Sequence, residues 1–122
     1  MTKTATVVLN GQSVTAGMAA TSFPATGGNA VTGVIGLALQ IVCDYGVGTA
    51  TVGVLVELLT SPNNTNYDTE AYVAQFIPVG TGIKTLTIAI PYAEDICYYR
   101  VRITGATSSS ATVTINELAV IP

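Results

Sequence analysis

The sequence contains no histidine, and only 9% of its 122 residues are charged. Typical globular proteins carry about 25% charged residues, so neutral side chains must build most of this surface. Without histidine the chain lacks the commonest general base, the usual zinc ligand and the base of a Ser-His triad. The composition argues against an enzyme, and we expect no metal and no cofactor.

Positive charge is also scarce: four Lys and Arg stand against seven Asp and Glu, which gives a net charge of −3. Nucleic-acid binding needs clustered basic residues, and only Arg100 and Arg102 form a pair. The longest apolar segment, residues 30–43, is too short for a membrane helix and is interrupted by polar residues. The N-terminal residues lack the apolar stretch of a secretory signal. We therefore expect neither nucleic acid nor a membrane as a partner.

Only two cysteines are present, Cys43 and Cys97. Two thiols are too few for a disulfide framework or for a zinc site. The simpler interpretation is two buried thiols that pack as small apolar side chains. A single disulfide between Cys43 and Cys97 is the alternative, and it would require an oxidising compartment.

The most regular feature of the sequence is an alternation of apolar and polar residues. Apolar and polar residues alternate in seven segments: 4–12, 33–45, 50–60, 69–77, 84–90, 96–104 and 112–121. A period of two residues is typical of half-buried strands, and helical periodicity does not persist beyond a turn. The pattern predicts one all-β domain over residues 1–122, a β-sandwich or jelly roll of about seven to eight antiparallel strands.

The segments between these strands carry turn residues. We predict loops over 18–29, 46–49, 61–67, 78–82, 91–95 and 105–110. Near Asn116 and Glu117 the alternation slips, which predicts a β-bulge. Size scaling predicts that roughly 6,200 Å² stays exposed, about a third of the unfolded surface, so the chain can form one core.

The seven carboxylates are the candidates for acid-base or calcium-binding groups. They are Asp44, Glu57, Asp68, Glu70, Glu94, Asp95 and Glu117. None sits in a recognisable catalytic motif, and most are expected at strand ends or on outward faces, where a solvated carboxylate is the better interpretation. The acidic pairs are too sparse for the six or more oxygen ligands of a calcium site.

Tyrosine and arginine supply the best candidate contacts. Tyr67 lies beside an Asn-rich loop, Tyr92 lies in an acidic loop, and Tyr98 shares the outward face of 96–104 with Arg100 and Arg102. Both residue types are enriched at protein interfaces. Alternatively, a tyrosine ring covers the edge of the core while its hydroxyl remains exposed to solvent. We predict these five residues as interface or ligand contacts.

Two stretches resemble small β-sandwich proteins of tailed-phage particles. Residues 61–69, Ser-Pro-Asn-Asn-Thr-Asn-Tyr-Asp-Thr, resemble a loop of the form Ser-x-Asp-Gly-x-x-Trp/Tyr between two strands. Asn63-Asn64 replaces Asp-Gly, and both pairs suit a tight turn that admits positive φ. Residues 98–104, Tyr-Tyr-Arg-Val-Arg-Ile-Thr, resemble a late aromatic-Arg-Val-Arg strand. Similar stretches occur in carbohydrate-binding and discoidin-like sandwiches.

The resemblance implies a bacteriophage virion protein without catalytic residues. The expected example is a capsid decoration (cement) protein, often a homotrimer, that binds the major capsid protein and copies of itself on the outer capsid surface after assembly in the host cytoplasm. A tail or fibre component is one alternative. The other is a carbohydrate-binding module that recognises a glycan through Tyr67, Tyr92 and Asn66.

Overall fold

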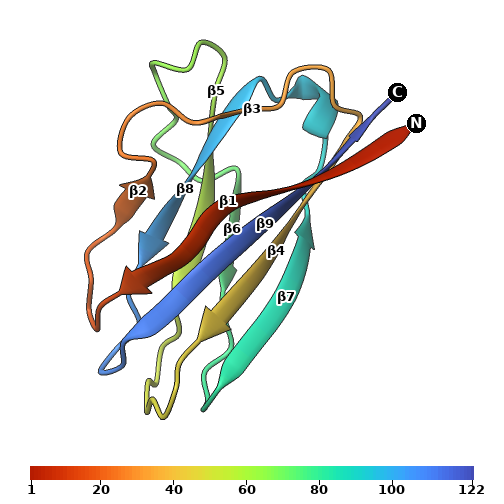
Figure 1. Ribbon diagram of the computed structural model, residues 1–122. Helices are drawn as coiled ribbons and strands as arrows, with labels where there is room; N and C mark the ends of the chain where they lie inside the picture. The colour runs from red at the N-terminus through yellow and green to blue at the C-terminus, as the bar shows by residue number, and fades with distance from the viewer.

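A computed structural model describes all 122 residues (Figure 1). It contains nine strands and one short 3₁₀ turn, η1. These are β1 (Thr2–Val14), β2 (Thr21–Phe23), β3 (Asn29–Ala30), β4 (Gly36–Asp44), β5 (Leu55–Ser61), β6 (Val73–Phe76), β7 (Ile83–Ala89), η1 (Ala93–Asp95), β8 (Tyr98–Thr104) and β9 (Ala111–Ile121). The chain contains no helix with the length and apolarity needed to span a membrane.

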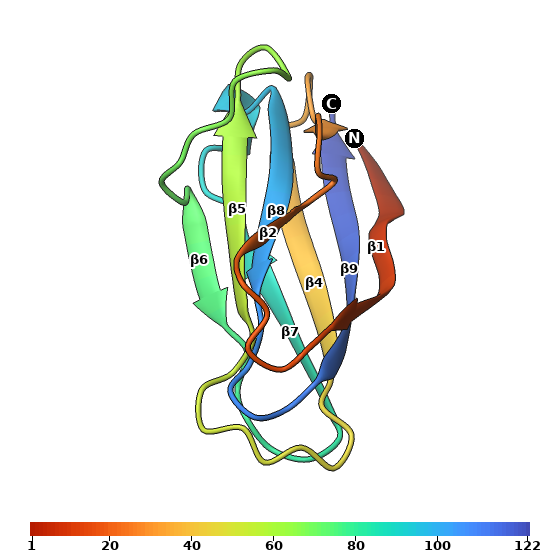
Figure 2. The same cartoon turned by 90° about the vertical axis from the view of Figure 1, so that its left-hand side faces the viewer.

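The strands form two antiparallel sheets that face each other (Figure 2). One sheet has the order β1-β9-β4-β7, and the other has the order β2-β8-β5-β6. β3 also pairs with β8, so β2 and β3 lie along one edge of β8 as a single interrupted strand. β1 pairs with β9, β2 and β3 with β8, β4 with β7, and β5 with β6. This reverse-order pairing is that of an eight-stranded jelly roll, which confirms the predicted fold class.

All seven predicted strands are present, with shifted ends. The prediction was wrong for residues 50–54 and 69–72, which were expected to be strand and lie in the loops before β5 and β6. It was also wrong for part of the segment 18–29, which contains β2 and the start of β3 as well as a loop. These strands have three and two residues, too few to show an alternation in the sequence. They form because β8 offers them a row of backbone partners, which is a tertiary effect.

The predicted irregularity near Asn116 lies on the partner strand. β9 keeps an unbroken register with β4. Where β9 pairs with β1, the register shifts between Val7 and Leu9 and again between Leu9 and Gln12, so β1 carries an extra residue at each place. Gly11, with φ of 60°, lies within the second bulge.

The core lies between the two sheets and contains 22 buried residues in one cluster. The alternation predicted over 33–45 is confirmed in β4, where Leu37, Leu39, Ile41 and Cys43 are all buried on the inward face, and buried Tyr45 follows them. The folded chain exposes 6211 Å², in agreement with the value expected from its size.

Both cysteines are free thiols. Cys43 is buried near the end of β4, whereas Cys97 is half-buried directly before β8. These strand ends lie at opposite ends of the sandwich (Figure 1). The alternative of a bridge is therefore wrong, because a disulfide needs Cα atoms within about 7 Å. Burial raises the pKa of the Cys43 thiol to about 11, which disfavours a reactive thiolate.

Glu117 departs from the expectation that the carboxylates are solvated. It shares the inward face of β9 with Ile115, pairs with Leu39 of β4, and is only 8% exposed. Tyr99 of the facing sheet lies close enough to affect this carboxyl group, yet neither Glu117 Oε1 nor Tyr99 Oη has a hydrogen-bond partner. Burial raises the pKa of Glu117, and the nearby Tyr99 hydroxyl offsets part of that rise.

The first prediction concerns Tyr45, whose hydroxyl donates to the carbonyl of Ile77 and accepts from the amide of Val54, both at 3.0 Å. Tyr45→Phe leaves these buried backbone groups without a partner. We expect the free energy of unfolding to fall by about 1–3 kcal/mol in urea titrations. The control Tyr92→Phe, at an exposed tyrosine, should change it by less than about 0.5 kcal/mol. Equal effects of both changes would contradict this role of Tyr45.

The second prediction concerns pH. Because the pKa of folded Glu117 lies above its ordinary value of 4.5, the stability that it contributes is fully present below pH 4.5. That contribution is lost as the pH rises through the raised pKa. Glu117→Gln should remove this loss, so the variant gains stability relative to the parent chain between pH 4.5 and neutrality in urea titrations. Glu94→Gln, at an exposed position, should not gain in the same way.

Candidate functional site

Three of the predicted contacts lie together on the outer face of the sheet that contains β8. Tyr98, Arg100 and Arg102 are half-buried and alternate with the buried residues of β8. β8 runs between β5 on one side and β2 and β3 on the other, so these side chains stand at the centre of that face. The predicted outward face is therefore confirmed.

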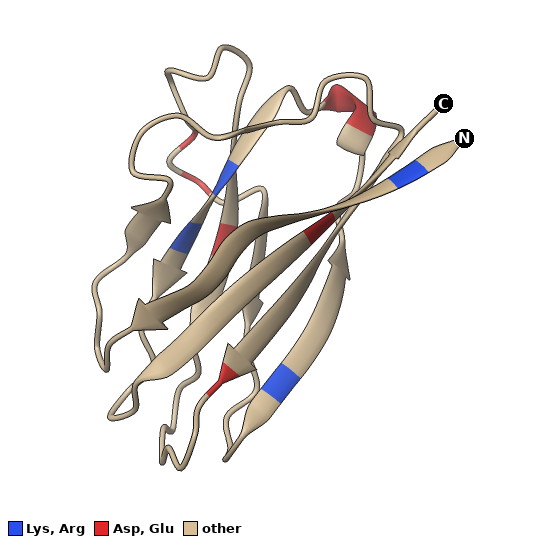
Figure 3. Cartoon of the chain, in the orientation of Figure 1, with Lys and Arg blue, Asp and Glu red and all other residues tan.

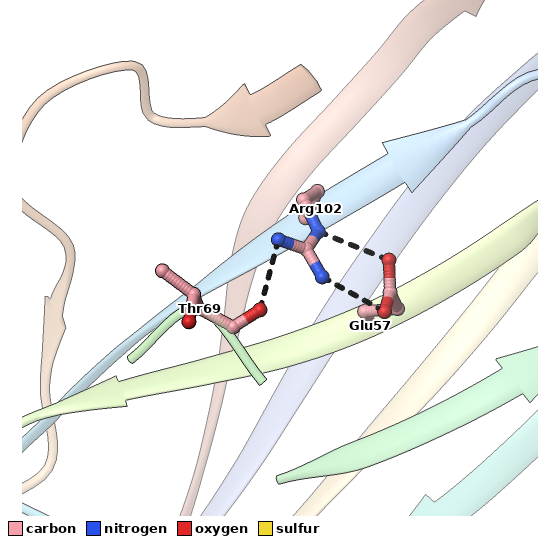
Figure 4. Close-up of polar contacts among 3 residues, drawn as sticks. All are labelled: Glu57, Thr69 and Arg102. Atoms are coloured by element: carbon pink, nitrogen blue, oxygen red, sulfur yellow. Dashed lines mark hydrogen bonds and ion pairs between the residues drawn. The ribbon is translucent and has the colours of Figure 1, made fainter. Parts of the chain in front are cut away.

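Arg102 is fully engaged inside the chain (Figure 4). Its Nε and Nη2 atoms donate to the two carboxylate oxygens of Glu57, each at 3.0 Å, and Nη1 donates to the carbonyl of Thr69 at 3.2 Å. Glu57 lies directly opposite on β5, and the two side chains are only 25% and 15% exposed. Such a bidentate pair is strong and directional. Arg102 thus fastens the 62–72 loop to the sheet and is not a free charge on the surface.

Arg100, two residues before Arg102 on the same face of β8, has a similar role. Its guanidinium carbon lies 4.2 Å from the centroid of the Tyr67 ring, and Nη1 donates to the carbonyl of Ala25 at 3.3 Å. Tyr67 in turn donates from its hydroxyl to Asn64 Oδ1 at 2.6 Å. Gly28 lies against the Tyr67 hydroxyl, where a Cβ atom would collide with that hydroxyl and with the carbonyl of Tyr99. The stacked pair therefore joins the two loops that flank β8, residues 24–28 and 62–72.

The Asn-rich turn has the predicted geometry. Asn64 has φ of 60°, the left-handed conformation that asparagine tolerates. Asn63 Oδ1 accepts from the amides of Thr65 and Asn66, at 3.0 and 2.9 Å. The turn is held by its own side chain, and Asn66 itself is exposed.

Leu59 is a buried apolar residue on the outer face of this sheet. It pairs with Arg100 across the sheet and shares the outer face, yet it is only 2% exposed and does not belong to the central core cluster. The 62–72 loop is hydrogen-bonded on either side of it, since the amide of Asp68 donates to the carbonyl of Thr60 and the amide of Tyr72 donates to the carbonyl of Leu58. The signal in the sequence was Leu58-Leu59, two adjacent apolar residues where a half-buried strand has one.

Tyr92 lies directly before η1, outside β8 and the 62–72 loop that contain the other predicted contacts. It precedes η1 with φ of 52° and is 71% exposed. Its neighbours are Tyr72, whose hydroxyl donates to the carbonyl of Pro91, and the acidic residues of η1. No hydrogen bond or stacking contact joins Tyr92 to Tyr67. Tyr92 thus takes no part in the contacts that tie Tyr67 to Arg100 and Asn64.

The carboxylates do not converge either. Glu57 binds Arg102, Asp44 accepts from the amide of Gly46 at 2.8 Å, and Asp68 accepts from the Thr60 hydroxyl at 3.1 Å. No three of the acidic and cysteine side chains come close enough together to hold a metal ion. These carboxylates act mainly as local hydrogen-bond acceptors.

A surface that the sequence analysis missed lies at one end of the sandwich. Four loops meet there, namely 15–20, 45–54, 77–82 and 105–110. None of the four contains a charged residue. At the lower end, Figure 3 shows only one acidic position at the end of β4 and one basic position on β7, and these strands contain Asp44 and Lys84 as their charged residues. We call the four loops, together with the adjoining strand ends at Phe76 and Ile83, the uncharged end.

The uncharged end also presents large apolar side chains to solvent. These are Val47 (90% exposed), Ile83 (64%), Phe76 (55%), Val52 (48%) and Val79 (41%). Val52, Phe76 and Val79 line one open hollow of about 300 Å³. Soluble proteins rarely leave several large apolar side chains exposed together unless the surface binds something.

Hydrogen bonds between the loops fix the shape of the uncharged end. The amide of Tyr45 donates to the carbonyl of Gly82, and the amide of Gly82 donates to the carbonyl of Gly46. Thr107 Oγ1 accepts from the amides of Thr51 and Val52, at 3.1 and 3.0 Å. The apolar side chains are therefore held on a cross-linked frame. Residues 50–54 of this surface were predicted as part of a strand, and the other three loops have few apolar residues; the signal was the absence of charge from all four loops.

No protein-family model and no curated protein matches the chain. Over 97% of its length the chain is similar to part of a solved structure of infectious bursal disease virus, Gx strain, with a TM-score of 0.51 and 12% sequence identity. The match spans only 31% of that viral chain. At this identity the likeness concerns the fold, so the chain is a β-sandwich similar to one part of a chain in a virus structure.

Proposed function

We propose that the chain is a structural protein of a virus particle that binds a shell protein through its uncharged end and catalyses no reaction. The observation that carries the proposal is the uncharged end itself, with five exposed large apolar side chains on a cross-linked frame. The fold likeness to part of a viral chain supports it. So does the resemblance of residues 61–69 and 98–104 to phage sandwich proteins.

The composition of the surface suits this role. Burial of apolar area is worth about 25 cal/mol per Å², from which the costs of association are subtracted, so one copy gains a modest affinity. A symmetric shell repeats the contact many times, and linked contacts multiply a modest affinity. A net charge of only −3 puts little repulsion between crowded copies.

The finer form of the proposal is a capsid decoration protein. Seated by its uncharged end on the outer capsid surface, the chain turns the opposite end outward, with η1, the Asn-rich turn and both termini (Figure 1). Its partners are then the major capsid protein and neighbouring copies. The glycan alternative has no comparable support, because the Tyr67 ring already carries the Arg100 guanidinium on one face.

The third prediction tests the uncharged end. Val47→Asp and Ile83→Asp each place a charge in the proposed apolar contact without touching the core. We expect each to weaken binding to shells assembled from the major capsid protein of the same virus by about tenfold or more, measured by co-sedimentation. Tyr92→Asp, a matched change at the opposite end, should bind like the parent chain.

Two outcomes would contradict the proposal: absence of binding by the parent chain, or equal binding by all three variants. Urea titrations of each variant keep a loss of binding separate from a loss of folding. Glycan-array binding that Tyr67→Ala abolishes would favour the carbohydrate alternative.

The fourth prediction tests whether Arg102 stabilises the fold or contributes to shell binding. Arg102→Gln removes the bidentate pair and leaves Glu57 without its partner. The free energy of unfolding should fall by about 1.5–3 kcal/mol, while the folded variant still binds shells with unchanged affinity. A loss of affinity without a loss of stability would instead make Arg102 an interface residue.

A further inference from the structure

The two sheets of a sandwich have four edges, and an edge strand offers unpaired backbone groups to any second strand. Three of these edges are protected here. β2 and β3 have three and two residues, and β6 has four and is followed closely by Pro78. β7 carries Lys84, which is in register with buried Cys43 and whose ammonium lies near Gly80. Short strands, proline and inward-facing lysine all discourage pairing at an edge.

The fourth edge is β1, and only half of it is protected. Its two bulges begin at Val7 and disturb the strand from there to Gln12. Thr2–Val7, in contrast, keep a continuous register with Ile121–Asn116 of β9. All six residues are exposed, and no backbone hydrogen bond outside the regular pairing involves them. Thr, Ala and Val with a single charge, Lys3, make a good strand and a weak barrier to pairing.

We propose that two copies of the chain associate through the Thr2–Val7 edge of β1, related by a two-fold axis perpendicular to the sheet. The four-stranded sheet of each copy then continues into the other. With Ala5 next to Ala5 of the second copy, Thr4 falls opposite Thr6 and Lys3 falls opposite Val7. The only charge in the segment thus meets an apolar side chain and never its own copy.

Because the Thr2–Val7 segment can pair with itself in this register, we expect the partner strand to be that of a second copy of the chain. A contact between identical edges closes at two copies, whereas a contact between β1 and the β7 edge of another copy would propagate without end. The start of β1 also lies at the end of the sandwich opposite to the uncharged end (Figure 1). A dimer therefore leaves both uncharged ends free, and dimerisation can fail without any effect on shell binding.

The fifth prediction places charges at Ala5, which lies at the two-fold axis of the proposed dimer. The parent chain should show a concentration-dependent dimer in sedimentation equilibrium. Ala5→Lys and Ala5→Glu each place like charges directly opposite one another and should weaken the dimer by about five-fold or more. Mixing the two variants pairs Lys with Glu and should restore association. Thr87→Lys, at an exposed position on β7, the other edge strand of the same sheet, should dimerise like the parent chain.

Hydrogen exchange supplies a second measurement on the parent chain. Alternate amides of Thr2–Val7 point away from β9, and these should become protected as the concentration rises. A monomer at all concentrations, a trimer, or equal weakening by Ala5→Lys and Thr87→Lys would overturn the proposal.

Discussion

Every strand of the sandwich is hydrogen-bonded to a strand from the other half of the chain. Each pairing joins one of β1–β5 to one of β6–β9, so neither half of the sequence can form its sheet alone. The fold therefore depends on long-range closure, which makes formation cooperative and comparatively slow. The same topology gathers four connections at one end of the molecule. The uncharged end is thus a consequence of the pairing order, since its loops are distant in the sequence.

Five of the charged side chains, out of four basic and seven acidic, make contacts that hold the chain together. Arg102 with Glu57 and Arg100 with Tyr67 fix the loops that flank β8, and Asp44 and Asp68 accept local hydrogen bonds. Glu117 is withdrawn into the interior beside Tyr99. The surface that remains is built from hydroxyl, amide and small apolar groups. Such a surface selects partners through shape and burial and has little means of electrostatic steering.

The two surfaces left unpartnered lie at opposite ends of the molecule and differ in physical character. The uncharged end offers apolar side chains on a cross-linked frame, whereas the start of β1 offers backbone donors and acceptors. One surface suits a neutral apolar partner and the other suits an extended strand. A small protein that repeats on a symmetric particle can use both kinds of contact at once, because neither obstructs the other.

The sequence by itself determined the all-β class, seven of the strands, the inward faces of β4 and β8, and the positive-φ turn at Asn64, because these depend on local alternation and turn chemistry. Tertiary structure alone decided the rest. β2 and β3 exist through the edge of β8, and Glu117 points inward because the pairing of β9 with β4 fixes its face. The two arginines predicted as free contacts are held by Glu57 and Tyr67, whose positions no pattern along the chain reveals. The uncharged end could not be recognised either, since a surface built from four separate loops exists only after the strands have paired.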